Sequence, residues 1–312
     1  MTPVMVSARI AVHIGYHKTA TTWLQREIFP RHPRLRPLVT GSPHGNPFLA
    51  EIIGRADRDF DADRAREILV EQCAALAPSP EDVVVISAER LSGHAATGGY
   101  DAVRIADRLH AVVPDAKVFF AVREQVEMIE SEYRQLVLEG SPAKLSVLLH
   151  RTPTWFDVGF DLGHYEYDRL ADAYAVRFGS TQVQVFAFEL ISRDQAGFLG
   201  QLARFLEVAD WPALPADVLT GRVNRGISPR LLGLRRAMNH FERSPLNPAP
   251  WFTLPPFWRT PLAALAARLP NRRSSLIDHE TQEWIVARFR ASNERLANRY
   301  RVELGDPSGR SR

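Results

Sequence analysis

Short runs of consecutive apolar residues recur along the first two thirds of the chain, each bounded by polar residues. There are four of them, at residues 9–14, 82–87, 117–122 and 182–188. Continuous rather than alternating apolar runs are typical of strands that are buried on both faces of a parallel sheet. The sequence therefore predicts four central strands.

Stretches with apolar residues at helical spacing follow these runs. They predict helices at residues 21–29, 63–77, 100–113, 124–139, 165–177 and 194–206. Strands that alternate with helices form a parallel sheet covered on both faces. The fold class expected is therefore α/β, with a parallel sheet flanked by helices on both faces.

The last third of the chain is predicted to be mostly helical, at residues 228–241, 261–269 and 279–300. Residues 244–261 interrupt it with a proline-rich stretch that carries two Trp and two Phe residues. We interpret this insertion as a packed loop, a wall over an acceptor pocket, or a partner surface. Residues 1–304 are expected to form one domain, and residues 305–312 a disordered tail.

Composition narrows the class of protein. Of 312 residues 45% are hydrophobic and 24% charged, and the net charge of +3 is too small to indicate a nucleic-acid partner. The single cysteine, Cys73, excludes an internal disulfide framework and a cysteine metal cluster, and we expect an inert thiol on a helix. No membrane span or signal peptide is recognisable, so a cytoplasmic location is expected.

The most informative segment is HIGYHKTATTWLQ, in which residues 15–22 follow the first predicted strand and lead into a helix. Backbone N–H groups at such a turn bind anions. A nucleoside triphosphatase loop reads G-x-x-x-x-G-K-S/T, but Ala20 and Thr21 stand at its Gly-Lys positions and Lys18 comes three residues earlier. Only three of the 39 basic residues are Lys, which favours a specific use of Lys18.

A second anion site is indicated at the third predicted strand, where Arg123 stands at the end and Ser131 follows eight residues later. Ser131 lies about 140° around the helix from the apolar Val126, at 100° per residue. An Arg at a strand end and a Ser on the next helix can hold one phosphate together. The alternative is a surface ion pair of Arg123 with Glu124 or Glu127.

Both segments resemble sulfotransferases, in particular bacterial ones, that use 3′-phosphoadenosine 5′-phosphosulfate. Lys18-Thr19-Ala20-Thr21-Thr22-Trp23 is similar to the family's K-[ST]-G-T-T loop, and Arg123 with Ser131 is similar to its second signature. Ala20 replaces the commoner Gly, and we expect the replacement to be tolerated if φ is negative there.

The resemblance implies that the parallel sheet has a P-loop-like fold, and that the chain binds this donor and needs no metal. Lys18 would contact the oxygen that bridges phosphate and sulfate, and Trp23 would stack on adenine or pack in the core. Arg123 and Ser131 would bind the 3′-phosphate. A late loop with Arg222, Arg225 and Gly226 would close over the nucleotide, or form a surface turn instead. The donor loop implied is His17, Lys18, Thr19, Ala20, Thr21 and Thr22.

Transfer to a hydroxyl also needs a base, for which Glu89, His94 and His17 are the candidates. Glu89 follows the second predicted strand, where the resemblance favours a glutamate base. Glu189, after the fourth strand, is expected to be structural.

The sequence therefore predicts sulfuryl transfer to a hydroxyl, less readily an amine, of a small molecule, glycan or lipid. An ATP-dependent kinase and a non-catalytic nucleotide-binding protein are the alternatives.

Overall fold

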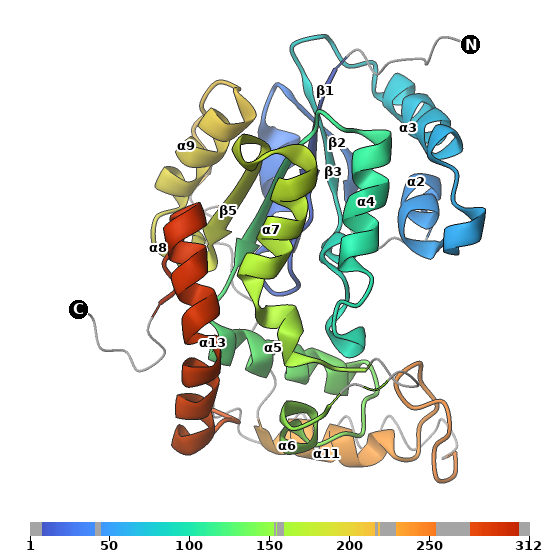
Figure 1. Cartoon of the computed structure of the whole chain (residues 1–312), viewed down its shortest axis with the longest axis vertical. Helices are drawn as coiled ribbons and strands as arrows, with labels where there is room; N and C mark the ends of the chain where they lie inside the picture. The colour runs from blue at the N-terminus through green and yellow to red at the C-terminus, as the bar shows by residue number, and fades with distance from the viewer. Residues whose placement is uncertain are drawn as a thin grey trace.

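A five-stranded sheet forms the centre of the molecule in the computed structural model (Figure 1). All of its pairings are parallel, in the order β2-β3-β1-β4-β5. The strands are β1 (Arg9–His13), β2 (Leu35–Thr40), β3 (Val83–Ser87), β4 (Lys117–Val122) and β5 (Val183–Ala187). The structure describes residues 8–40, 45–152, 154, 159–215, 218, 229–253 and 275–305.

Four of these strands confirm the predictions made from the apolar runs, whereas the sequence did not predict β2. It carries Arg36 and Pro37 and pairs only with β3, and its register shifts after Pro37. Proline cannot donate to a ladder and is tolerated at a sheet edge, so an edge strand can lack the apolar signal that marks buried ones.

The longer helices confirm the helices predicted from the apolar spacing, with bounds that agree to within about two residues at each end. They are α3 (Ala62–Leu76), α4 (Ala102–Val112), α5 (Gln125–Leu138), α7 (Tyr167–Phe178), α9 (Gln195–Leu206), α11 (Pro229–Asn239) and α13 (His279–Tyr300). The shorter ones are α1 (Thr21–Trp23), α2 (Pro47–Leu49), α6 (Leu145–Leu149) and α8 (Phe188–Arg193). The helix expected at 21–29 is α1 continued by a π-helical stretch, Leu24–Ile28. The helix expected at 261–269 lies outside the described residues.

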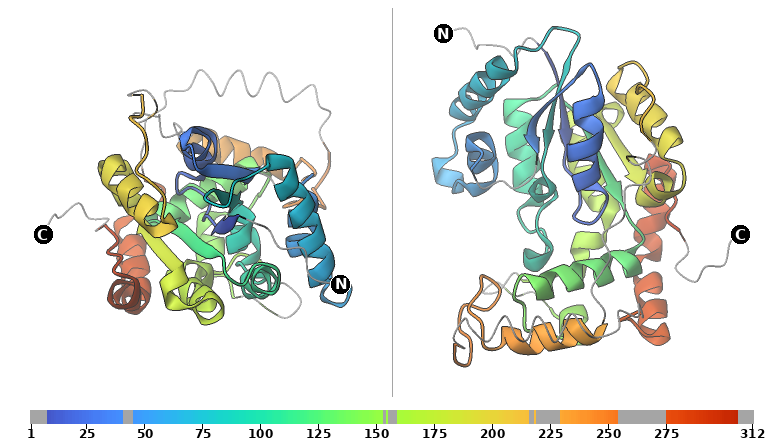
Figure 2. Two further views of the ribbon diagram at one scale, coloured as in Figure 1. Left: turned by 90° about the horizontal axis from the view of Figure 1, so that it is seen from above. Right: turned by 180° about the vertical axis from the view of Figure 1, so that it is seen from behind.

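The sheet is covered on both faces, as the continuous apolar runs predicted. Helices α3, α4 and α7 lie on one face (Figure 1), and α9 lies with the α1 segment on the other (Figure 2). Successive residues of a strand point to opposite faces. Thus Val84 and Ile86 join one core cluster, whereas Val83 and Val85 join the other.

Beyond the carboxyl ends of the strands, α5 runs across the edge of the sheet, and α11 packs against its far side (Figure 1). The face of α5 that carries Val126, Ile129 and Tyr133 is buried as predicted. Helix α13 contacts both α5 and α7. This arrangement places α5 opposite the loops that leave β1, β3 and β4.

Two smaller expectations concern other parts of the chain. Cys73 is buried in α3, and burial raises the pKa of its thiol to about 11, as expected for an inert thiol.

Of the proline-rich insertion, residues 244–253 are described and carry Trp251 and Phe252, which are 74% and 59% exposed. Its role stays a prediction, and residues 306–312 of the expected tail lie outside the described part.

Candidate functional site

The loop after β1 has an unusual backbone conformation. Lys18 and Ala20 both have φ of 64°, in the left-handed region, so the condition of a negative φ at Ala20 is not met. Among the described residues, no acceptor is found for the backbone N–H groups of residues 17–20. Where left-handed residues alternate with residues of negative φ, successive backbone N–H groups point into one concave surface. Such a surface can bind an anion.

Buried contacts hold this loop in place. Tyr16 is 2% exposed and donates its hydroxyl to the His164 carbonyl at 2.9 Å. The hydroxyls of Thr19 and Thr21 both donate to the Tyr16 carbonyl, at 2.7 and 3.2 Å. The Thr21 hydroxyl is therefore already used inside the loop, whereas Thr22 is exposed.

Lys18 points toward α5. Its ammonium donates to Gln135 Oε1 at 2.9 Å, and the amide of Gln135 donates to Glu139 Oε1 at 2.8 Å. Ser131 lies one turn before Gln135, about 40° away around the helix. The structure thus brings the Lys18 side chain and Ser131 to the same face of α5.

Arg123 lies at the junction between β4 and α5, at the same edge of the sheet. Its guanidinium pairs with Glu127 at 2.6 Å and lies over the ring of Phe188, 4.9 Å from its centroid. The surface ion pair that was the alternative interpretation is thus present. The Glu127 side chain is 56% exposed, and such a pair contributes at most about 1 kcal/mol.

His17 and Glu89 form an ion pair between the loop and the end of β3. Nδ1 of His17 lies 2.9 Å from Glu89 Oε2, and its Nε2 is buried without a partner among the described residues. Burial acts to lower the pKa of His17, but the hydrogen bond to Glu89 and the charges of Glu132, Glu89 and Glu139 raise it above 6.5. Burial acts to raise the pKa of Glu89, yet His17 and Lys18 lower it below 4.5.

His94 completes this group of candidate bases. Its ring lies edge-on to that of His17, with centroids 5.2 Å apart, and its Nδ1 accepts from the Ala96 N–H. Burial and the neighbouring His17 lower the pKa of His94. All three candidates therefore lie together beside the donor loop.

Glu132 is a residue of this site that the sequence did not reveal. It follows Ser131 on α5 and is 4% exposed. The positive charges of His17 and Lys18 act to lower the pKa of its carboxyl. Burial raises the pKa of its carboxyl to about 6. In the sequence it is one of several glutamates on one helix, and only the packing of the loop against α5 distinguishes it.

The remaining predicted residues lie apart from this group or outside the described part. Trp23 is partly buried against the core cluster of α9, and its indole N–H donates to the Val218 carbonyl at 2.9 Å. That position corresponds to the core alternative. Glu189 accepts the Glu124 N–H at 3.1 Å, in agreement with a structural role. Arg222, Arg225 and Gly226 lie outside the described residues.

No group of His, Cys, Asp or Glu side chains among the described residues has the arrangement of a metal site. No described helix has the length and apolar character needed to cross a membrane.

Comparison with solved structures identifies the fold. A sulfotransferase from Alicyclobacillus acidocaldarius matches with a TM-score of 0.56 at 16% identity, over 95% of this chain and 97% of that one. The chain has the sulfotransferase fold.

Two further solved structures match with TM-scores of 0.40 at 14% identity. One is the sulfotransferase domain of the Synechococcus PCC 7002 olefin synthase, matched over 86% of this chain and 99% of that one. The other is the sulfotransferase domain from the curacin biosynthetic pathway, matched over 91% and 97%. No protein-family model and no curated protein matches the sequence.

Proposed function

We propose that the protein transfers a sulfuryl group from 3′-phosphoadenosine 5′-phosphosulfate to the hydroxyl of an acceptor. The observation that carries this proposal is the position of the His17–Glu89 pair, directly beside the free N–H groups of residues 17–20. Transfer of an anionic group to a hydroxyl needs an anion cradle and a proton acceptor side by side. The sulfotransferase fold supports the same reaction.

The donor fits the groups available on the loop and on α5. The free N–H groups would hold the 5′-phosphate, and the Lys18 ammonium would stabilise charge on the bridging oxygen as the bond to sulfur breaks. Arg123 and Ser131 would bind the 3′-phosphate. For this Arg123 exchanges its exposed partner Glu127 for a more highly charged one, at little cost.

His17 and Glu89 together would remove the proton of the acceptor. A base works best when its pKa lies near the working pH, and the raised pKa of His17 meets this condition better than the lowered pKa of Glu89. The proton would pass to Nε2 of His17, and Glu89 would orient the ring and stabilise the imidazolium through Nδ1. His94 is the second candidate base.

The reaction requires an acceptor that carries a hydroxyl group. A small molecule, a carbohydrate or a lipid can present the hydroxyl, and an amine is the less favoured nucleophile. No metal is assigned to the reaction.

Calorimetric titration tests the donor. Adenosine 3′,5′-bisphosphate is expected to bind more tightly than adenosine 5′-monophosphate, and more tightly than ATP with Mg²⁺. Tighter binding of ATP with Mg²⁺ would favour the kinase alternative. A third outcome would favour the non-catalytic alternative. In it the bisphosphate binds, but no hydroxyl acceptor in a screen causes the donor to be converted to the bisphosphate.

Arg123→Ala tests the second anion site. The substitution should weaken binding of adenosine 3′,5′-bisphosphate roughly 10- to 100-fold, the effect of losing one charged hydrogen-bonding group. Binding of adenosine 5′-monophosphate should change little. Arg193→Ala, at an exposed position of α8, is the matched control. An equal loss for both nucleotides would contradict a 3′-phosphate role.

A further inference from the structure

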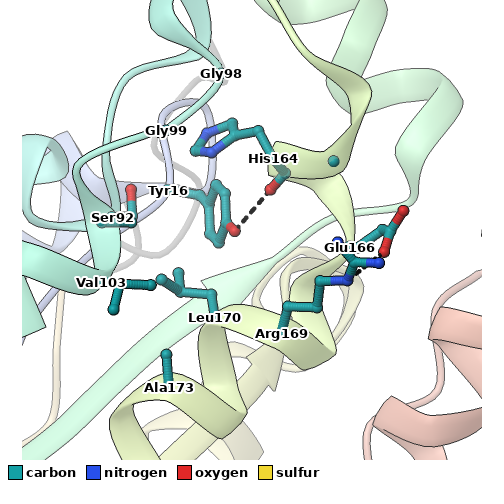
Figure 3. A pocket seen from close by; sticks show the side chains of 12 residues that line it. Tyr16, Ser92, Gly98, Gly99, Val103, His164, Glu166, Arg169, Leu170 and Ala173 are labelled. Atoms are coloured by element: carbon teal, nitrogen blue, oxygen red, sulfur yellow. Dashed lines mark hydrogen bonds and ion pairs between the residues drawn. The ribbon is translucent and has the colours of Figure 1, made fainter. Parts of the chain in front are cut away.

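A pocket lined by residues of α4 and α7 opens beside Tyr16, which directly precedes the donor loop (Figure 3). Its volume is about 160 Å³. Tyr16 and His164 lie on one side, and Val103, Leu170 and Ala173 supply apolar walls. None of the candidate bases lines it, and neither does Lys18, so this pocket is separate from the proposed transfer site.

His164 gives the pocket a built polar group. The residue is 8% exposed, its ring lies 5.0 Å from that of Tyr16, and neither ring nitrogen has a partner among the described residues. Burial, with the positive charge of His17, lowers its pKa to about 3, so the imidazole is neutral at physiological pH. A neutral imidazole donates one hydrogen bond and accepts another.

Gly99 is needed for this placement. Its φ is +63°, and a Cβ there would lie 2.3 Å from Nδ1 of His164. The glycine therefore lets the His164 ring lie against the α4 side of the pocket.

A cation lies at the rim. The Arg169 side chain is 71% exposed and pairs with Glu166 Oε2 at 2.6 Å. The other oxygen of Glu166 accepts from Arg288 at 3.3 Å. A ligand carboxylate can thus bind Arg169 while Glu166 keeps a partner, so the exchange leaves no buried charge unpaired.

We propose that this pocket binds a small aromatic carboxylate, with its ring among Tyr16, Leu170 and Ala173 and its carboxylate on Arg169. An apolar cavity of about 150 Å³ holds one benzene ring, which sets the size of the ligand. The apolar walls of Val103, Leu170 and Ala173 favour a flat ring, and the guanidinium at the rim favours an anion.

Occupancy is coupled to the donor loop. The Tyr16 hydroxyl donates a hydrogen bond to the His164 carbonyl, and Tyr16 directly precedes His17 in the chain. A ligand ring packed on Tyr16 restricts the donor loop that follows it, and this changes the affinity of the loop for a nucleotide. The coupling rests on the proposed function, whereas binding of the carboxylate does not.

Titration of the full chain with benzoate, followed by NMR, tests the site. Benzoate should bind with a Kd on the order of 1 mM, and the neutral benzyl alcohol at least about tenfold more weakly. Failure of benzoate to bind at about 20 mM, or equal binding of both compounds, would overturn the proposal.

Two substitutions locate the binding. Ala173→Leu fills the pocket and Arg169→Gln removes the cation, so each should weaken benzoate at least about tenfold. Val176→Leu, at an 83% exposed position of the same helix, should change nothing. Unchanged thermal unfolding confirms that each variant is folded. If neither substitution weakens benzoate, it binds elsewhere and the assignment is wrong.

The coupling has its own measurement. Saturating benzoate should change the affinity for adenosine 3′,5′-bisphosphate about fivefold or more. No change overturns the coupling. If the bisphosphate does not bind at all, the proposed function fails, while the benzoate titration still decides the pocket.

Discussion

Lys18 is the residue on which the proposed chemistry depends most directly. It is one of three lysines in the chain, and its ammonium is held toward α5 by Gln135. Such a compact charge, placed where negative charge develops, acts mainly on the transition state.

Lys18→Ala should therefore lower kcat by about 100- to 1,000-fold, the usual effect of removing one such donor. The Kd of adenosine 3′,5′-bisphosphate, which lacks the sulfate, should change much less. Lys144→Ala, at an exposed position before α6, is the control and should leave both values unchanged. A loss confined to nucleotide affinity, with kcat intact, would contradict the assigned role.

Glu132 allows a prediction about pH. His17 must be neutral to accept a proton, so kcat/KM for the acceptor should rise with pH through the raised pKa of His17. Glu132→Gln removes a negative charge that raises this pKa, so the neutral form becomes available at lower pH. The rising limb of the pH–rate profile should therefore move to lower pH.

Glu130→Gln is the matched control for this profile. Glu130 lies on the same helix and pairs with Arg134, and its charge is not among those that act on His17. An unmoved or upward-shifted limb in Glu132→Gln would show that this carboxyl does not influence the base.

At the scale of elements, periodicity predicted the buried strands and the long helices because each is determined by its own burial pattern. It missed β2, whose apolar signal is broken by Arg36 and Pro37 at the sheet edge. It missed Gln135 and Glu132 because their roles arise only when the loop packs on α5. Contacts between distant segments leave no periodic trace in the sequence.

The donor loop shows the same limit at Ala20. A left-handed φ is the reason for glycine at such a position, and an alanine there stores about 1–2 kcal/mol of strain, which exceeds the entropic cost of glycine of about 0.5–1 kcal/mol. Ala20→Gly should therefore stabilise the protein by about 0.5–1 kcal/mol, measured by urea unfolding.

The helical position Ala74 provides the opposite control for Ala20→Gly. Ala74 is exposed on α3, and Ala74→Gly should destabilise by about 1 kcal/mol. Destabilisation by both substitutions would mean that the left-handed conformation at Ala20 is not the one adopted in solution.

At the scale of the whole molecule, α13 connects the C-terminal part of the chain to α5 and α7 through side-chain contacts. Its Asn293 exchanges two hydrogen bonds with Gln125 at the start of α5, at 2.7 and 3.0 Å. Arg295 pairs with Asp168 of α7 at 2.5 Å. These contacts lead us to propose that residues 1–304, with α13 included, unfold as one unit.

Phe289→Ala tests that proposal, since Phe289 is fully buried where α13 meets the core. If α13 belongs to the cooperative unit, the substitution should lower the free energy of unfolding by about 3–5 kcal/mol. In urea the single transition should move to lower concentration with an unchanged slope, because the surface exposed on unfolding stays the same. Val286→Ala, at a 37% exposed position of the same helix, should cost about 0.5 kcal/mol or less. A helix that docks independently would give a different result: an early separate transition in circular dichroism, with the main midpoint unmoved.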